Sequence, residues 1–291
     1  MNILITGGAG FIGSHIVEKL QKFKSKIYIL DNLKTGHRIL INKNAHFIKG
    51  DIKNKKILMK IIKQFKVHTV FHLAASLNIK EAERKKKKYK ENNIQGTKNI
   101  ILACKKSEVK NFIFSSSCSV YGNVKGKVSE KQKLDPKNYY AYTKMKSEEI
   151  IKKYSTKYNY NYAILRYFNV AGASNSKKIG EIEHSHDHLI KNIAIQSLKK
   201  KPKIDIYGNN YSTKDGTCIR DYIHVSDLAD IHVACLKYLK KRKKSLILNC
   251  GYGKGYSVLE IINVFKKINK KLIINIRKRR PGDIAEIYSD T

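Results

Sequence analysis

The segment NILITGGAGFIG, residues 2–13, places an apolar run directly in front of a glycine cluster. The run at residues 2–6 is typical of a buried β-strand, and residues 11–23 carry apolar side chains at helical spacing. The backbone amides of the glycine turn would face the N-terminus of that helix, where an anion is favoured. The order of strand, tight turn and helix therefore predicts an anion-binding unit at the start of the fold.

Three glycines in this turn have the spacing of a dinucleotide-binding loop. Gly7 and Gly10 let the backbone approach a pyrophosphate, and Gly13 lets the helix pack closely on the strand. Such spacing also occurs by chance in ordinary turns, so its context decides. The next apolar run, residues 26–30, ends in Asp31. A carboxylate there can accept both ribose hydroxyls of adenosine and repels a 2′-phosphate, which favours NAD over NADP; the alternative is a residue that merely opens a loop.

Strand-like and helical patterns alternate over the first 168 residues. This alternation predicts parallel strands joined by helices, a Rossmann-type doubly wound α/β sheet covered on both faces. The expected strands are residues 2–6, 26–30, 45–48, 69–73, 111–115 and 162–168, and the expected helices are residues 11–23, 55–65, 92–106 and 140–158.

After Phe168 the alternation loosens. We expect a His-rich helix start at 184–188, short strands near 204–207 and 218–219, and a helix at 226–240 and a strand at 246–249 that return to the main sheet. The chain would then form a NAD-binding domain and a smaller, discontinuous C-terminal lobe for the substrate. The expected bounds are 1–168 plus about 222–250 for the first, and 169–221 and 251–291 for the second.

Positive charge dominates the composition of this 291-residue chain. It has 60 Lys and Arg against 23 Asp and Glu, a formal net charge of +37. The lysines are spread over most helices and loops, without a basic arm or a recognition motif. A solvated surface that attracts anionic substrates is therefore favoured over a specific nucleic-acid interface.

Cysteine usage and hydropathy narrow the class further. The five cysteines are scattered and show no C-x-x-C spacing, which argues against a disulfide framework or a zinc site, so we expect no metal. No segment is apolar and long enough for a membrane span. The first strand begins at residue 2, without room for a leader, and we expect a cytoplasmic protein.

Candidate catalytic groups follow strand 111–115 and open helix 140–158. Ser115, Ser116 and Ser117 lie at a strand end, where ligands bind in doubly wound sheets. Tyr140 and Lys144 are four residues apart and share a helix face. An ammonium beside a phenol should lower the phenol pKa toward neutrality and make it a usable base.

A second pair, Tyr142 and Lys146, has the same spacing on another side of the helix. Either pair alone would read as an ordinary surface pair on a helix, and the serines as a polar strand exit. The dinucleotide turn and the serine-ended strand together favour Tyr140 and Lys144.

These motifs resemble the extended short-chain dehydrogenase/reductase family over essentially the whole chain, in its UDP-glucose 4-epimerase branch. The family-level motifs are TGGAGFIGSH at 6–15, DNL at 31–33, GDI at 50–52, HLAA at 72–75 and NNIQGT at 92–97. The epimerase motifs are SSSCSVYG at 115–122, LRYFNVAGA at 165–173 and DGTCIRDYIHVSDLAD at 215–230.

The resemblance implies a role for each matching residue. Ser117 would hydrogen-bond the sugar 4-hydroxyl, Tyr140 would remove or return its proton, and Lys144 would hold the nicotinamide ribose. The implied NAD contacts are Gly7, Gly10, Phe11, Ile12, Gly13, Asp31, Asn32, Leu33, Thr35, Gly36, Asp51, Ile52, Leu73, Ala74, Ala75, Leu77, Asn92, Lys144 and Phe168. The implied UDP-sugar contacts are Ser117, Tyr140, Asn169, His188, Leu189, Tyr207, Arg220, Arg280 and Asp283, with Arg279 as the alternative to Arg280.

The resemblance also implies the reaction: NAD-dependent, reversible C4 epimerisation of a UDP-hexose, UDP-galactose or UDP-glucose, through a 4-keto intermediate. Dehydratases of this family have Thr-Asp-Glu where this chain has Ser117-Cys118-Ser119, so elimination of water is not expected. A UDP-N-acetylhexosamine or a UDP-hexuronate is the alternative substrate, and the bulk of Ile287 argues against an N-acetyl group. A non-catalytic basic NAD-binding protein is a second alternative. By analogy with the family we expect a homodimer.

Overall fold

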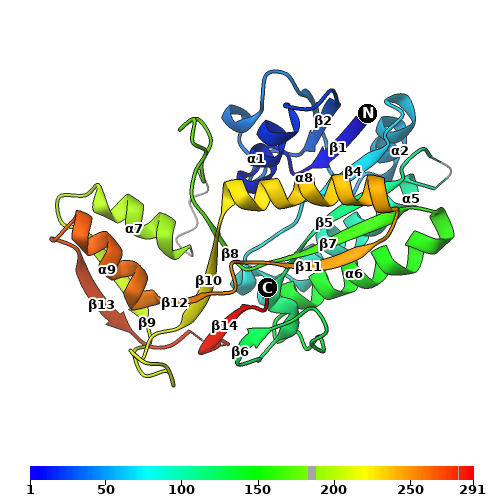
Figure 1. The fold of residues 1–291 in the computed structure, drawn as a ribbon. Helices are drawn as coiled ribbons and strands as arrows, with labels where there is room; N and C mark the ends of the chain where they lie inside the picture. Colours follow the sequence, from blue (N-terminus) through cyan, green and yellow to red (C-terminus); the bar gives the residue numbers. More distant parts are fainter. Residues whose placement is uncertain (106, 183–187, 281) are drawn as a thin grey trace.

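The computed structural model describes residues 1–105, 107–182, 188–280 and 282–291. Its centre is a seven-stranded sheet in the order β11-β7-β5-β4-β1-β2-β3, with parallel pairing throughout (Figure 1). The strands are β1 (Asn2–Thr6), β2 (Lys26–Asp31), β3 (His46–Lys49), β4 (Thr69–His72), β5 (Asn111–Ser117), β7 (Asn161–Tyr167) and β11 (Leu246–Cys250). The predicted Rossmann-type doubly wound sheet is thus confirmed.

Helices cover both faces of this sheet because successive side chains of each strand point to opposite faces. Ile3 and Ile5 of β1 pack in one core with α1 and α8, whereas Leu4 packs in another with α2, α5 and α6. These helices are α1 (Phe11–Leu20), α2 (Lys55–Gln64), α5 (Gly96–Ala103), α6 (Tyr139–Tyr158) and α8 (Val225–Arg242). The strand order reverses between β1 and β4, and ligands bind at such a switch point in doubly wound sheets.

Several short elements lie in the loops at the carboxyl edge of the main sheet. They are η1 (Arg38–Leu40), α3 (Ile79–Arg84), α4 (Lys86–Tyr89), the π-helical turn η2 (Lys90–Gln95) and η3 (Cys118–Tyr121). The helix expected at 92–106 therefore begins as a π-helical turn and becomes α-helical only at Gly96.

The smaller lobe lies beside the carboxyl edge of the main sheet and contains two further sheets (Figure 1). One has the order β12-β10-β14-β6, with β8 paired to β10, and the other pairs β13 with β9. The elements are β6 (Gly126–Val128), β8 (Asn169–Ala171), α7 (Leu189–Ser197), β9 (Lys203–Tyr207), β10 (Ile219–His224), β12 (Gly255–Ser257), α9 (Val258–Ile268), β13 (Ile273–Arg277) and β14 (Glu286–Ser289). The expected domain bounds stay a prediction.

A separate apolar core holds the outer part of this lobe together. Ile193 of α7, Ile204 and Ile206 of β9, and Ile262 of α9 are buried against one another. Helix α9 begins with a capping box, in which Ser257 and Glu260 bond each other's backbone amides. The His-rich helix start expected at 184–188 falls, apart from His188, outside the described residues, and α7 begins at Leu189.

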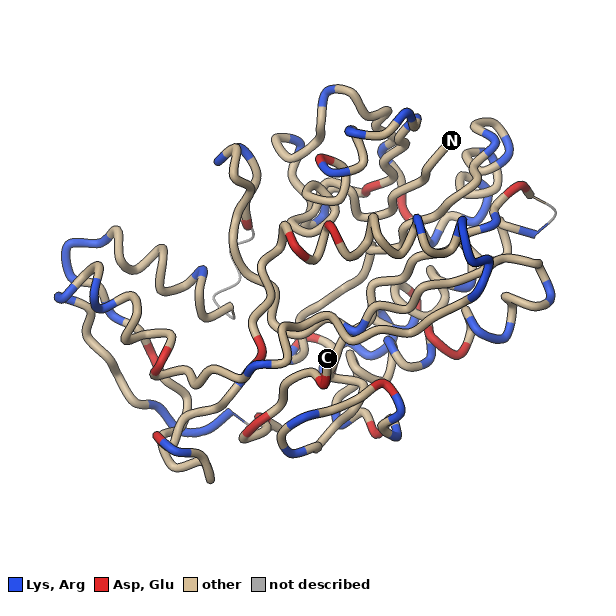
Figure 2. The backbone as a smooth tube through the Cα atoms, in the orientation of Figure 1, with Lys and Arg blue, Asp and Glu red and all other residues tan. Residues whose placement is uncertain are grey.

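Lysine and arginine residues are distributed along the helices and loops of both lobes (Figure 2). No helix of the described residues is long and apolar enough to cross a membrane.

Candidate active site

The glycine turn after β1 is packed against the end of β4. Gly7 has φ +76°, and a Cβ there would lie 2.7 Å from the backbone nitrogen of Ala74. A Cβ on Gly13 would lie 2.3 Å from the Gly7 carbonyl oxygen. Only glycine fits both positions, so the turn presents bare backbone to the first turn of α1. The geometry fits the phosphate cradle expected from the sequence.

Asp31 ends β2 and lies directly beside this turn. Its carboxylate is 8% exposed and accepts hydrogen bonds from the backbone N–H of Ala9 (3.1 Å) and of Leu33 (2.9 Å). Burial raises the pKa of Asp31, and these two hydrogen bonds oppose the rise. Gly36 packs on the carboxylate, whereas Thr35 is exposed. Two amides therefore fix an anionic acceptor at the place where a ribose is expected.

The segment after β3 lies beside the segment after β2. Asn32 Nδ2 donates to Asp51 Oδ2 (3.1 Å), and Lys34 Nζ lies 4.0 Å from the same oxygen. Ile52 is buried, and its side chain contacts Gly96. The residues expected at the adenosine thus form one continuous patch with Asp31.

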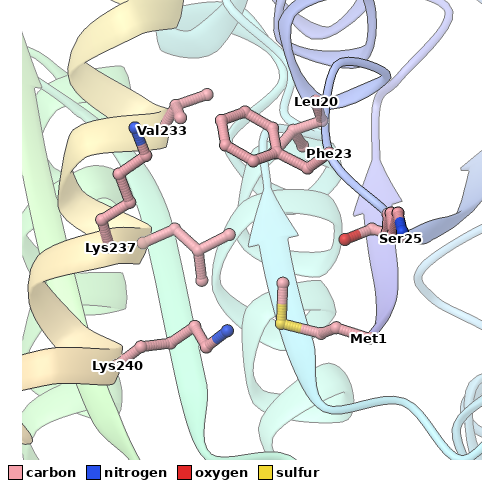
Figure 3. A pocket seen from close by; sticks show the side chains of 9 residues that line it. Met1, Leu20, Phe23, Ser25, Val233, Lys237 and Lys240 are labelled. Carbon is pink, nitrogen blue, oxygen red and sulfur yellow. The ribbon is translucent and has the colours of Figure 1, made fainter.

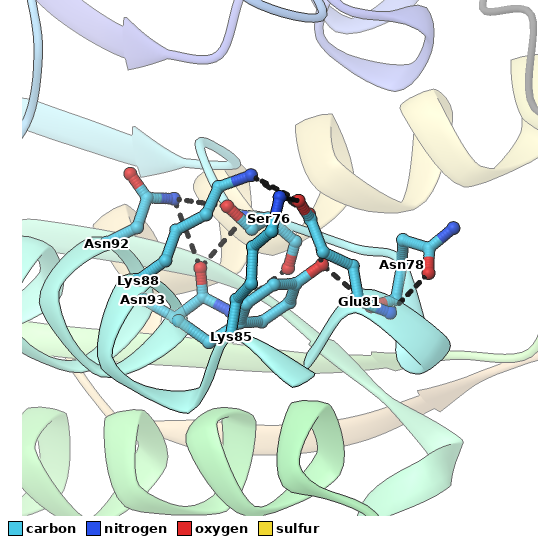
Figure 4. A network of polar contacts seen from close by, with 8 residues as sticks. Ser76, Asn78, Glu81, Lys85, Lys88, Asn92 and Asn93 are labelled. Atoms are coloured by element: carbon cyan, nitrogen blue, oxygen red, sulfur yellow. Dashed lines mark hydrogen bonds and ion pairs between the residues drawn. The ribbon is translucent and has the colours of Figure 1, made fainter. Parts of the chain in front are cut away.

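The loop after β4 is anchored by the side chains of η2 (Figure 4). Asn93 accepts from the backbone N–H of Ser76 (2.8 Å) and donates to the carbonyl of Ser76 (3.0 Å) and to Thr143 Oγ1 (3.0 Å). The expected contact, Asn92, donates to Ser76 Oγ (3.2 Å). The sequence prediction named Asn92 and missed Asn93, whose buried amide joins the loop to α6. Leu77 is 53% exposed.

In the lysine-rich segment that follows, two lysines pair with one glutamate (Figure 4). Glu81 accepts from Lys85 Nζ (3.1 Å) and Lys88 Nζ (2.9 Å), and these hydrogen bonds lower the pKa of Glu81 to about 2. Glu83 Oε1 accepts from the backbone N–H of Tyr139 (2.6 Å). The segment therefore packs against the start of α6, next to Tyr140.

Ser117, Tyr140 and Lys144 come together where β5 ends and α6 begins. Asn138 caps the helix by accepting from the backbone N–H of Ala141 (2.8 Å). Tyr140 is hydrogen-bonded to Ser117. Lys144 is 2% exposed; its Nζ donates to the carbonyl of Ser115 (2.6 Å) and lies 5.9 Å from the centroid of the Tyr140 ring.

The alternative pair on α6 has a different environment. Tyr142 is 38% exposed, and Lys146 pairs with Glu149 at 2.8 Å. This pair lies on the surface and contacts no residue of β5 in the hydrogen bonds and ion pairs of the described residues. The geometry therefore favours Tyr140 and Lys144 as the reacting pair.

Burial changes the pKa of both groups in a direction that the sequence did not predict for the tyrosine. It raises the pKa of the Tyr140 phenol above its usual value of 10, and the hydrogen bond from Ser117 opposes only part of this rise. It lowers the pKa of Lys144 from 10.5 to about 7, against the charge of Glu148. The prediction that Lys144 lowers the phenol pKa is wrong for the polypeptide by itself, because desolvation penalises the phenolate and the ammonium alike.

The remaining expected contacts of the cofactor and the substrate fall into three groups. Phe168 is buried after β7, and Asn169 is exposed at the start of β8. Arg220 on β10 donates to the carbonyl of Ile219 (2.8 Å), and its charge lowers the pKa of Cys118, which burial raises to about 12. The Arg220 guanidinium therefore lies close to the end of β5.

The second group lies in the outer part of the smaller lobe. The Arg280 guanidinium stacks 4.3 Å from the centroid of the Tyr207 ring, and its Nε lies 3.6 Å from Asp283 Oδ2. Arg279 instead stacks on Tyr211, at 4.1 Å, and donates to Asn210. Arg280 thus joins two other expected contacts, and Arg279 does not.

His188 and Leu189 lie at the start of α7. His188 Nδ1 lies 2.5 Å from Glu181 Oε1, and the side chain is half-exposed.

A hollow of about 280 Å³ lies elsewhere, between α1 and α8 (Figure 3). Its walls are apolar side chains of both helices and the stems of several lysines. The lining residues are Met1, Leu20, Phe23, Lys24, Ser25, Val233, Leu236, Lys237 and Lys240, and none of them is an expected site residue.

Comparison with known proteins agrees with this geometry. Residues 3–251 match the model of the NAD dependent epimerase/dehydratase family. A UDP-glucose 4-epimerase of Lactobacillus helveticus is 39% identical over 293 aligned residues, which cover 100% of this chain and 89% of that protein.

Two solved structures extend the comparison. One is a UDP-glucose 4-epimerase from Stenotrophomonas maltophila with bound NAD and formylated UDP-arabinopyranose, with a TM-score of 0.95 and 33% identity over 100% of this chain and 90% of that one. The other is the UDP-Glc/GlcNAc 4-epimerase of Campylobacter jejuni, with a TM-score of 0.85 and 38% identity over 99% and 90%. The chain belongs to the NAD dependent epimerase/dehydratase family.

Proposed function

We propose that this protein is an NAD-dependent UDP-glucose 4-epimerase, which reversibly inverts C4 of a UDP-hexose and interconverts UDP-galactose and UDP-glucose. The observation that carries the proposal is the group of Ser117, Tyr140 and Lys144 at the carboxyl edge of a sheet whose first turn is a glycine cradle. The relative from Lactobacillus helveticus is named for this activity.

The residues fit NAD as the cofactor. Gly7 and Gly13 let the turn lie against the end of β4 and against α1, because a Cβ at either position would meet backbone, and Asp31 is an anionic acceptor fixed by two amides. When bound, NAD supplies reversible hydride acceptance at the sugar carbon. Because the same hydride is returned, the cofactor is regenerated in each cycle and no reductant is consumed.

The chain's own residues handle the proton and the orientation of the sugar. Tyr140 takes the proton of the 4-hydroxyl as the sugar becomes a 4-keto sugar, and returns it after the ring has turned over. Ser117 holds the same oxygen by a hydrogen bond. Lys144 lies one helical turn from Tyr140, and its protonated amine stabilises the Tyr140 phenolate.

The neighbours of Ser117 explain why water is not eliminated. Cys118 stays a neutral thiol because burial raises its pKa to about 12. The Ser119 hydroxyl donates to Ser117 Oγ (2.9 Å). Neither group supplies an acid/base pair for dehydration, so oxidation is followed by return of the hydride.

UDP-N-acetylhexosamine is the second candidate substrate, since the Campylobacter jejuni relative is named for both sugars. Ile287, expected at the position that limits sugar size, is 3% exposed and packs in one core cluster with Phe168, Val120 and Tyr121. This packing favours the smaller hexose. Comparison of kcat/KM for UDP-galactose and UDP-N-acetylgalactosamine decides between them.

A direct assay tests the proposal. The purified protein, with its NAD content measured, should convert UDP-galactose to UDP-glucose without added reductant. Tyr140→Phe should lose at least about 100-fold in kcat, the usual contribution of a general base, while keeping NAD. Absence of conversion by NAD-loaded protein would remove the proposal. A homodimer and a cytoplasmic location remain expectations from the family.

A further inference from the structure

A buried ion pair lies directly behind the catalytic residues. Glu148 follows Lys144 by one turn of α6, and its side chain is 1% exposed. Arg166 of β7 contacts both carboxylate oxygens, with Nε 3.1 Å from Oε1 and Nη2 2.7 Å from Oε2. Glu148 and Arg166 are 18 residues apart, and this spacing gives no sign that the two side chains meet.

Ser116 connects this pair to the catalytic strand end. Its hydroxyl donates to Glu148 Oε1 at 2.6 Å. On β5, Ser116 lies between Ser115, whose carbonyl accepts from Lys144, and Ser117, which is hydrogen-bonded to Tyr140. Glu148 therefore ties the strand that carries Ser117 to the helix that carries Tyr140 and Lys144.

The far side of Arg166 is also fully engaged. Its Nη1 donates to Tyr121 OH (3.0 Å) and to the carbonyl of Glu130 (3.3 Å), and Tyr121 OH donates to Asn249 Oδ1 (2.6 Å). A buried pair of this kind is weak evidence for a gain in stability, because apolar residues often replace it without loss. Its place behind the catalytic group is the better explanation.

We propose that Glu148 is a positioning residue for the epimerase reaction, which holds Ser117 and Lys144 in register through Ser116 and keeps Lys144 in its ammonium form. Only the turnover assay of this inference rests on the proposed function. The hydrogen bonds from Ser116 to Glu148 and from Lys144 to the Ser115 carbonyl belong to the fold whatever the reaction is.

The charged and titratable groups around Lys144 support the electrostatic part. Burial lowers the pKa of Lys144 to about 7, and the negative charge of Glu148 raises it. His72 of β4 faces Lys144 but is neutral, because burial and the ammonium lower its pKa to about 3. In the polypeptide by itself Tyr140 adds no charge beside Lys144, because burial raises the pKa of its phenol.

Glu148 itself is faced by further groups. Arg166 pairs with it closely, and Lys152 Nζ lies 3.9 Å from Oε2. Tyr162 is a neutral phenol, because burial raises its pKa and the Glu148 carboxylate adds to the rise. Glu148 is the carboxylate that favours the protonated form of Lys144.

Three variants test this inference in the NAD-loaded protein: Glu148→Gln, Ser116→Ala, and Glu149→Gln as the control. Glu149 is the next residue of α6, is exposed and pairs with Lys146. In Glu148→Gln we expect kcat for UDP-galactose to fall roughly 10- to 100-fold, the usual effect of a small displacement of reacting groups, with little change in KM.

The pH profile of kcat shows whether Glu148 acts through its charge or only by holding the structure together. Without the Glu148 charge the pKa of Lys144 falls, so the alkaline limb of kcat should move to lower pH in Glu148→Gln. In Ser116→Ala the charge remains, so kcat should fall while the limb stays in place. Glu149→Gln should match the parent protein in both respects.

A second readout does not depend on turnover. The titration of the Lys144 amine itself is followed by NMR of the protein with ¹³C-labelled lysine, in which the Lys144 signal is the one missing from Lys144→Met. It should move to lower pH in Glu148→Gln, because the ammonium loses the negative charge that favours it. If the parent protein turns over no UDP-galactose, the proposed function fails and this titration still decides the role of Glu148.

An unchanged titration and an unshifted alkaline limb in folded Glu148→Gln would overturn the inference. Should Glu148→Gln fail to fold because Arg166 is left unpaired, Ser116→Ala decides. Parental kcat in Ser116→Ala would then refute the positioning role.

Discussion

Replacing Lys144 with Met should abolish turnover and at the same time stabilise the fold near neutral pH. Lys144 is 2% exposed, and burial lowers its pKa from 10.5 to about 7. At about 1.4 kcal/mol per pKa unit, this shift corresponds to roughly 5 kcal/mol of destabilisation when the buried amine is charged. Met leaves the carbonyl of Ser115 without its donor, which costs about 1–3 kcal/mol. The net gain should be about 2–4 kcal/mol.

The sign of this effect depends on pH. Below about pH 7 the amine is charged in the folded and the unfolded protein, so the full penalty of the buried charge is present. Between pH 7 and 10.5 the unfolded chain binds more protons than the folded one, so the stability of the parent protein rises with pH. Above that window only the lost hydrogen bond remains, and the variant should be the less stable protein.

Urea unfolding at pH 6.5 and pH 10.5 measures both regimes, with the NAD content of the two proteins matched, since bound ligand adds to apparent stability. Lys146→Met is the control, because Lys146 lies on the same helix but pairs with Glu149 at the surface. It should change the free energy of unfolding by less than about 0.5 kcal/mol. If Lys144→Met is less stable than the parent at pH 6.5, the assigned burial penalty is refuted.

Three further substitutions test other parts of the site. Gly13→Ala should destabilise the protein by about 1–3 kcal/mol and reduce NAD retention, because the new Cβ meets the Gly7 carbonyl at 2.3 Å; equilibrium unfolding and the absorbance of released cofactor measure both. Asp31→Asn should narrow the preference for NAD over NADP, because it removes the charge that repels a 2′-phosphate, and titration with each cofactor measures the ratio. Asp221→Asn should destabilise by about 1–3 kcal/mol in urea unfolding, whereas exposed Asp290→Asn should not, because the buried Asp221 carboxylate accepts from Tyr252 N, Gly253 N and Ser289 at 2.6–3.2 Å.

The sequence predicted the central sheet closely, because its strands are short apolar runs between clear turns. Its periodicity failed where side-chain hydrogen bonds decide the backbone. The strand expected at 218–219 extends from Ile219 to His224, because the polar Asp221 within it is satisfied by the loop after β11. The helix expected at 92–106 starts as a π-helical turn, where Asn93 bonds Ser76 and Thr143.

The catalytic residues could be named from spacing, but their electrostatics could not. Spacing places Tyr140 and Lys144 on one helix face, and this alone suggests an ammonium that acidifies a phenol. The opposing term, desolvation, depends on how deeply β5, β4 and α6 enclose the pair, which no local pattern reveals. The contact between Glu148 and Arg166 could not be predicted from a local pattern either, because it forms only when β5 pairs with β7.

The environment of Lys144 explains why the fold keeps a buried lysine although its charge lowers the free energy of unfolding. A lysine whose pKa lies near 7 is poised between two charge states, and a small electrostatic change selects one of them. The Ser115 carbonyl and the Glu148 carboxylate both favour the ammonium, while burial favours the amine. Burial also disfavours the anionic form of Tyr140. An ammonium at Lys144 and a phenolate at Tyr140 therefore each cost less when the other is present. In the role proposed above, the ion pair behind Ser116 supports the catalytic residues from outside the active site, because the charge of Glu148 favours the protonated form of Lys144 from which the proton transfer starts.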